Sequence, residues 1–171
     1  MRNVFVLILL LMVSCAPVKV SFDYDENTDF SQYKSYNYYT DIKTGLSELD
    51  TKRLFKALDE ALQNQGFVLS DSPDFFIDIQ SSEYQETNRN SVGLGIGGSG
   101  RNVGGGISIG IPVRQDNINR VIQFDFVDEN GKGLFWQAVS ESSFNPKATP
   151  EERNAQLQSI VAKVLKGFPP K

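Results

Sequence analysis

The sequence predicts an α+β domain, with an antiparallel sheet of about five to seven strands and two helices packed on one face. Three observations support this fold class. Several segments alternate apolar and polar residues with the period of two that is typical of a half-buried strand. Two other segments carry apolar residues at helical spacing. Most strands follow one another through links of hairpin length, which favours antiparallel neighbours.

Two predicted strands come first, over residues 16–24 and 33–39. Each contains alternating apolar or aromatic side chains. The second strand carries four tyrosines: Tyr33, Tyr36, Tyr38 and Tyr39. The alternation places Tyr36 and Tyr38 on one face, and Tyr33 and Tyr39 on the other. Since one core needs only one face, the second set is a candidate partner surface; the alternative is aromatic packing between strands.

Two helices are predicted from spacing and capping. Over residues 47–65, leucines recur at helical spacing, and Gly66 occupies the usual position of a left-handed stop. The second helix begins at Thr149, because Thr149-Pro150-Glu151-Glu152 combines a capping threonine, proline at the first position and glutamate at the third. Gly167 ends it.

Three more strands are predicted over residues 74–84, 120–128 and 134–144. The last two are joined by Asn130-Gly131, a dipeptide typical of a tight hairpin. Residues 91–111 are rich in glycine, which accounts for nine of the 18 residues from 93 to 110. Isoleucines at alternate positions predict two thin strands joined by a flexible tip; a disordered linker is the alternative.

The N-terminus has the layout of a secretory signal peptide over residues 1–14. A positive residue, Arg2, precedes an unbroken apolar run from Val4 to Val13, which is too short to span a bilayer as a helix. Met12-Val13-Ser14-Cys15 resembles the bacterial lipobox, which implies cleavage before Cys15 and lipid attachment to its sulfur. Residues 15–171 then form a single domain held at a membrane by its acylated cysteine.

The composition argues against several kinds of chemistry. The chain has no histidine and Cys15 is its one cysteine, so we expect no disulfide, no metal site, no cofactor and no enzymatic activity. The 17 basic residues are scattered among 21 acidic ones, which argues against nucleic-acid binding. Gly106–Gly110 matches a serine-hydrolase motif and Gly95–Gly100 a dinucleotide motif, but neither is followed by a predicted helix.

Carboxylates leave two weaker alternatives. The first is a calcium loop over residues 23–29, which places four Asp and Asn side chains at alternate positions but lacks the glycine and glutamate of an EF-hand. The second is a catalytic carboxylate pair, formed by Asp71 with Asp74 or by Asp125 with Glu141. Solvated turns and strand surfaces are the favoured interpretation of these residues.

Several segments together resemble the DUF4136 family of bacterial lipoproteins. They are Asp29–Tyr36 (DFSQYKSY), Gln65-Gly66-Phe67, Pro73–Ile77, Gly133–Ala138 and the final Phe168-Pro169-Pro170. The resemblance implies an envelope lipoprotein of a Gram-negative-type bacterium with an α+β domain and no known catalytic residues. We therefore expect an outer-membrane lipoprotein that faces the periplasm and binds or scaffolds another envelope protein. The alternative is a small-ligand or lipid-binding module in which residues 91–111 form a mobile lip.

Overall fold

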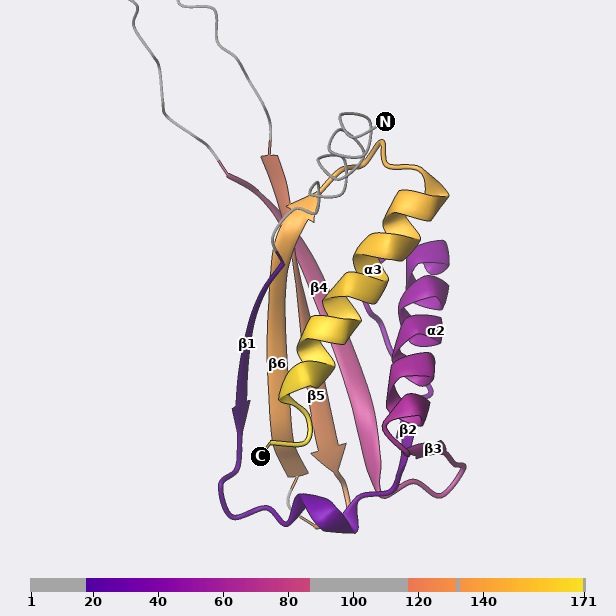
Figure 1. Ribbon diagram of the computed structural model, residues 1–171, viewed down its shortest axis with the longest axis vertical. Helices are drawn as coiled ribbons and strands as arrows, with labels where there is room; N and C mark the ends of the chain where they lie inside the picture. The colour runs from indigo at the N-terminus through magenta and orange to yellow at the C-terminus, as the bar shows by residue number, and fades with distance from the viewer. Residues whose placement is uncertain (1–17, 87–116, 132, 171) are drawn as a thin grey trace, which may run out of the picture.

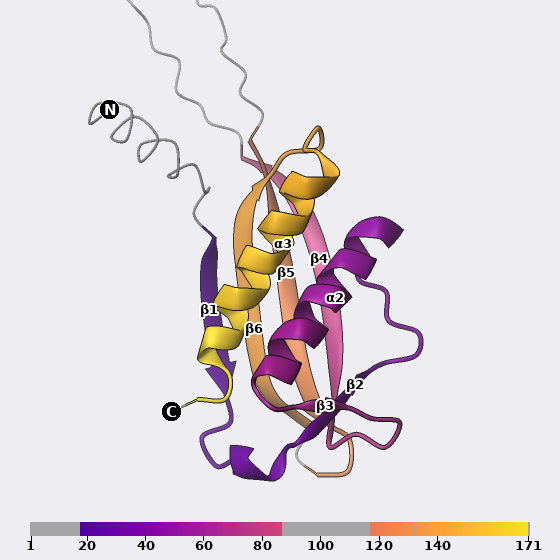
Figure 2. The same ribbon diagram turned by 45° about the vertical axis from the view of Figure 1, so that its right-hand side comes forward.

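The computed structural model describes residues 18–86, 117–131 and 133–170 (Figure 1). A six-stranded sheet has the order β1-β6-β5-β4-β2-β3. The strands are β1 (Lys19–Tyr24), β2 (Ser35–Tyr38), β3 (Val68–Leu69), β4 (Phe75–Glu86), β5 (Asn117–Asp128) and β6 (Gly133–Phe144). Helices α2 (Glu48–Asn64) and α3 (Pro150–Val164) both cover one face of this sheet (Figures 1 and 2). The predicted α+β class, with both helices on one side, is confirmed.

Helix α2 begins and ends where the local sequence predicts. The Ser47 hydroxyl accepts a hydrogen bond from the Asp50 backbone N–H at 3.2 Å, which caps the first turn. Leu54, Leu58 and Leu62 are fully buried against the sheet. Gly66 has φ +94°, a conformation that a residue with a side chain rarely adopts, so the helix stops there.

Helix α3 starts with a complete capping box. The Thr149 hydroxyl accepts from the Glu152 N–H, and the Glu152 carboxylate accepts from the Thr149 N–H at 2.8 Å. Its apolar stripe lies against the sheet, and a short 3-10 helix, η2 (Leu165–Gly167), follows it. The core therefore lies between one sheet face and the two helices.

Aromatic rings fill the end of this core that lies next to η2. Phe168, which follows η2, contacts six other rings, and its ring centroid lies 4.7 Å from that of Phe126. The Trp136 indole N–H donates to the Gly167 carbonyl at 3.2 Å. At the sheet edge, Lys163 Nζ donates to the carbonyl of Val18, just before β1, at 3.0 Å. The C-terminal segment thus closes the core.

The sheet is mixed, whereas the sequence predicted an antiparallel one. β2 pairs in parallel with β4 and with β3, while β1, β6, β5 and β4 form antiparallel pairs. The physical reason is α2, which follows β2 and returns the chain to the same end of the sheet, as a helical crossover does. Residues 68–69, which were not predicted as a strand, consequently pair with β2 as a short edge strand.

Two predicted features lie outside the described residues. They are the signal peptide with the lipid attachment site at Cys15, and the glycine-rich segment 91–111. In the described part of the chain, no helix has the length and apolar character needed to cross a membrane.

Candidate functional site

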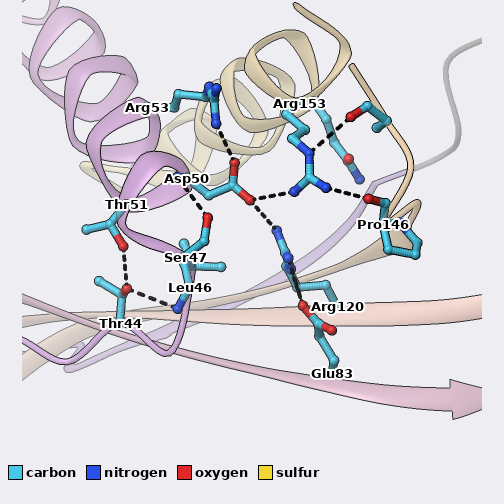
Figure 3. A network of polar contacts seen from close by, with 12 residues as sticks. Thr44, Leu46, Ser47, Asp50, Thr51, Arg53, Glu83, Arg120, Pro146 and Arg153 are labelled. Carbon is cyan, nitrogen blue, oxygen red and sulfur yellow. Dashed lines mark hydrogen bonds and ion pairs between the residues drawn. The ribbon is translucent and has the colours of Figure 1, made fainter. Parts of the chain in front are cut away.

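A buried carboxylate, Asp50, organises the polar contacts where the two helices begin (Figure 3). Its side chain is 1% exposed. Arg53 Nη1 lies 2.8 Å from one carboxylate oxygen, and Arg153 Nη1 lies 2.9 Å from the other. Arg120 Nη1 lies 3.6 Å from that second oxygen. Three guanidinium groups thus compensate one buried negative charge, as a buried ion requires.

The outer members of this Asp50 network have partners of their own. Arg120 Nη2 lies 2.7 Å from the Glu83 carboxylate, and the Arg120 guanidinium lies 3.5 Å from the Phe144 ring centroid. Arg153 Nη2 donates to the Pro146 carbonyl at 2.8 Å. Each of the three guanidinium groups thus already pairs with Asp50, and the network joins α2, α3, β4 and β5 as a structural element.

Three of the four tyrosines in the candidate partner surface lie on the helix side of the sheet. The hydroxyls of Tyr36 and Tyr38 donate to one Asp59 oxygen of α2, at 2.9 and 2.8 Å. Burial, together with the adjacent carboxylate, raises the pKa of both hydroxyls. Tyr33 stacks on Phe135 with ring centroids 4.2 Å apart.

The tyrosine surface therefore needs correction. Tyr33 and Tyr36 are 3% and 0% exposed, so neither is available to a partner in this fold. The alternation placed Tyr33 opposite Tyr36, but β2 begins only at Ser35, after a 3-10 helix, η1 (Phe30–Gln32). Tyr33 precedes the strand, so the period of two does not apply to it.

Of these four tyrosines, Tyr39 is the one that reaches the opposite side of the sheet, which we call the outer face. It stacks on Phe76 of β4, with ring centroids 5.0 Å apart. Burial, followed by a hydrogen bond to Glu129, raises the pKa of Tyr39 to about 12. The hydroxyl is therefore neutral over the physiological range and stays a hydrogen-bond donor.

The outer face carries a row of carboxylates across its strands. The strand register places Asp78 of β4 opposite Asp125 of β5, Asp125 opposite Gln137 of β6, and Gln137 opposite Asp23 of β1. We call these four residues the acidic row. The sequence alone does not reveal the acidic row, because its members are far apart in the chain and only the pairing of the strands brings them together. The available signal was alternation: Asp78 lies between Ile77 and Ile79, and Asp125 between Phe124 and Phe126, which predicts two outward carboxylates.

Side-chain amides hold the central carboxylate in place. Gln137 Nε2 donates to one Asp125 oxygen at 2.8 Å, and Gln123 Nε2 donates to the other at 2.9 Å. Gln80 Nε2 donates to Asp78 at 3.1 Å. Among the described residues, no lysine or arginine forms an ion pair with either of these aspartates.

A row of apolar residues lies next to the acidic row on the same face, two residues away along β4 and β5. Phe76 lies opposite Val127, and Val127 lies opposite Leu134, whose side chain is 51% exposed. We call these three residues the apolar row. A groove of about 1030 Å³ runs over this region. Its lining includes Asp78, Asp125, Val127 and Leu134 from the sheet, and residues 39–43 from the segment after β2.

Residues of the two carboxylate pairs suggested by the sequence have other neighbours in the structure. Asp74 accepts hydrogen bonds from the N–H groups of Lys34 and Ser35, both at 2.8 Å. Burial acts to raise the pKa of Asp74, but these hydrogen bonds outweigh it and the pKa lies below its usual value. Glu141 lies opposite Val121, whereas Asp125 lies opposite Gln137, so Asp125 and Glu141 are not neighbours in the register.

The acidic turn after β1 forms local hydrogen bonds instead of a calcium loop. Asp25 accepts from the Asn27 N–H at 3.0 Å and from the Thr28 hydroxyl at 3.1 Å. Asp29 accepts from the N–H and hydroxyl of Ser31. In the parts of the chain that the structure describes, no group of three potential ligand residues could hold a metal ion.

The fold and these surfaces define an α+β domain in which the described helices cover one sheet face and the other face bears an acidic row. The model of the family described as "Domain of unknown function (DUF4136)" matches residues 20–170. The chain therefore belongs to the DUF4136 family, as its motifs indicated. No curated protein matches the sequence.

Solved structures with the same fold include two bacterial proteins. A PDZ domain protein from Parabacteroides distasonis has a TM-score of 0.59 at 11% identity, over 99% of this chain and 40% of that one. This chain therefore spans less than half the length of that relative. The PelC dodecamer from Paraburkholderia phytofirmans has a TM-score of 0.50 at 11% identity, over 87% of this chain and 95% of that one. At these identities the likeness concerns the fold alone.

Proposed function

We propose that this protein is a lipid-anchored component of the bacterial cell envelope, and that its domain binds a protein partner through the outer face without catalysing a reaction. The observation that supports this most is the asymmetry of the sheet. Inward residues of β5 such as Phe124 are fully buried, whereas their outward neighbours Gln123 and Asp125 keep part of their surface exposed. A large sheet face that no described helix covers is a natural contact surface.

The anchor is proposed from the sequence. Cys15 follows a lipobox-like segment, and it is the one cysteine in the chain. Acylation explains why an exported protein keeps an unpaired thiol. We place the anchored domain at the outer membrane on its periplasmic side, because Ala16 and Pro17 lack the acidic character of an inner-membrane retention signal.

A small-ligand function is the second candidate, and the outer-face groove is the observation that favours it. Its volume of about 1030 Å³ is comparable to that of a small-molecule site. The groove lies at the side of the sheet away from the helices, and its lining mixes carboxylates with apolar side chains. A partner side chain and a free ligand would both fit this description, so binding experiments must separate them.

The anchor can be tested by metabolic labelling. Cells that express the chain are grown with a clickable palmitate analogue, and the purified protein is examined for label and for its mass. We expect label on the wild type and its absence from Cys15→Ser. Label retained by the variant, or a wild type without label, contradicts the proposed anchor.

The contact face can be tested by photo-crosslinking in cells. A photoreactive amino acid replaces Val139 on the outer face, or Gln158, which is exposed on α3. We expect a discrete protein adduct from position 139 and none from position 158. Adducts of equal intensity from both positions, or adducts from position 158 alone, contradict binding through the outer face.

A further inference from the structure

We infer that the partner of the outer face presents a cationic and apolar segment, whose positive groups pair with the acidic row while its apolar side chains cover the apolar row. This inference rests on the proposed function, since it names the chemistry of the partner for that same face. Three observations support it: the register that builds the two rows, the excess of carboxylates in the groove lining, which contains Asp41, Asp78 and Asp125 beside Lys43, and the charge of the chain itself.

The register gives the two rows a defined spacing. Neighbouring strands in a sheet lie about 4.8 Å apart, so Asp78 and Asp125 present carboxylates at about that separation, and Asp23 lies about two strands beyond Asp125. The apolar row lies about 7 Å further along the strands, because residues on one face recur every second position. A segment with lysine or arginine along one side and aliphatic residues along the other matches this pattern.

Asp78 and Asp125 lie directly opposite each other, and like charges in that position destabilise a sheet. Amides from Gln80, Gln123 and Gln137 orient the carboxylates. Lys43 lines the same groove, but among the described residues no ion pair to Asp78 or Asp125 is formed. Elsewhere in the described chain, a buried carboxylate such as Asp50 is matched by several arginines. A cation of a partner placed between Asp78 and Asp125 would relieve their repulsion.

The charge of the chain excludes two other occupants. The sequence has a net charge of −4, so a second copy would set one acidic row against another. The exposed lysines of α2, Lys52 and Lys56, are already paired with Glu48 and Glu60. An anionic phospholipid surface would be repelled for the same reason. A cationic protein segment is the occupant that the surface favours.

The test uses the chain as expressed, in micelles of a neutral detergent, with two synthetic peptides as probes. One peptide alternates lysine and leucine, and the other alternates glutamate and leucine. Binding is followed by fluorescence anisotropy, and the site is located by backbone amide chemical shifts. We expect the lysine peptide to bind at low salt and shift the amides of residues 78, 125 and 134, and the glutamate peptide to leave them unchanged.

A double variant provides the matched comparison. Asp78→Asn/Asp125→Asn removes two charges, keeps the side-chain shape and retains an oxygen for the glutamine amides. The control Glu26→Gln/Asp71→Asn removes two charges from exposed positions that do not line the groove. We expect the first variant to bind the lysine peptide at least tenfold more weakly, and the control to bind within about twofold of the wild type.

Two outcomes would overturn the inference. Equal weakening in both variants would mean that the peptide responds to overall charge, and unchanged affinity in the acidic-row variant would mean that these carboxylates are not its site. These results differ from a failure of the proposed function. Crosslinks from position 139 that survive the acidic-row substitutions would retain the outer face as a contact surface for a partner of different chemistry.

The melting temperature of the free protein gives an independent readout. Because the two aspartates repel each other, Asp78→Asn/Asp125→Asn should melt at a higher temperature than the wild type at low salt, and the difference should shrink at high salt. The control variant should not show this pattern. A melting temperature lowered by the acidic-row substitutions would contradict the repulsion on which the inference depends.

Discussion

The carboxylate of Asp50 accepts a hydrogen bond from the guanidinium of Arg153 at 2.9 Å, although 103 residues separate the two along the chain. The contact joins the first turn of α2 to the first turn of α3. Since Asp50 is 1% exposed, the arginines around it take the place of solvent as its partners. The relative position of the two helices is therefore coupled to one buried carboxylate.

Removing Asp50 should destabilise the protein strongly. In Asp50→Ala, three arginines lose their shared partner in a buried setting, so we expect the free energy of unfolding to fall by about 3–5 kcal/mol. Urea denaturation followed by circular dichroism measures this change. Glu48→Ala is the control, because Glu48 lies in the same turn and its pair with Lys52 is exposed; we expect a much smaller change there. Similar losses in the two variants would contradict the prediction.

Alkaline pH should destabilise the fold through its tyrosines. The pKa of Tyr36 and Tyr38 is raised in the folded state from the ordinary value of 10.0, and that of Tyr33 and Tyr39 to about 12. The unfolded chain loses these protons first, so this stabilisation is fully present below pH 10 and is lost as the pH rises above it.

Denaturation curves at a series of pH values, with tyrosinate absorbance as a second signal, test this. Tyr38→Phe should flatten the fall of stability above pH 10, since it removes a titrating group beside Asp59. Tyr24→Phe is a control at an exposed position. A wild type whose stability does not decline above pH 10 would rule out the mechanism.

Asp59 should matter for stability because two hydroxyls share its carboxylate. In Asp59→Ala, the hydroxyls of Tyr36 and Tyr38 lose their acceptor inside the domain. A buried donor without a partner costs about 1–3 kcal/mol, so we expect a loss in that range or somewhat above it. The triple variant that also carries Tyr36→Phe and Tyr38→Phe should recover part of the loss, because it removes the unpaired donors. No recovery would argue against this explanation.

The capping box of α3 should contribute modestly. Thr149→Ala removes the side-chain acceptor for the Glu152 N–H, and we expect a loss of about 1 kcal/mol. Thr149→Ser keeps the hydroxyl and should lose much less. Thermal unfolding of the three proteins in parallel gives the comparison, and equal losses in the alanine and serine variants would contradict a capping role.

Phe168 should be among the most sensitive core positions. It is 3% exposed and contacts rings from β4, β5 and β6. Phe168→Ala leaves a cavity at the centre of these rings, so we expect a loss of about 3–5 kcal/mol. Phe168→Leu should retain most of the stability, and exposed Phe22→Ala should cost little. Native-like stability of Phe168→Ala would show that the chain end is not part of the core.

The parts of the fold that depend on local sequence were predictable. The start of α3 follows from four consecutive residues, and the end of α2 from Gly66, since caps and stops are local interactions. The parallel pairing of β2 was not predictable in the same way. It depends on where α2 returns the chain, and no pattern within residues 35–38 distinguishes a parallel partner from an antiparallel one.

The candidate site was less predictable than the fold. Asp50 lies in the first turn of a helix, where an exposed acidic residue is common, and its burial depends on Arg120 and Arg153 far along the chain. The acidic row is invisible in the sequence for a similar reason. Each aspartate can be assigned to an outward position by alternation, but only the register places Asp78 beside Asp125.

If Cys15 is acylated as proposed, the hydrogen bond from Lys163 to the Val18 carbonyl limits the distance between the domain and the membrane. It fixes the chain to α3 three residues after Cys15. Three residues span at most about 11 Å even when fully extended. With Cys15 acylated as proposed, the domain would be confined to a thin layer next to the bilayer. Its partner would therefore have to lie close to the same membrane, or be a protein long enough to extend to that membrane surface.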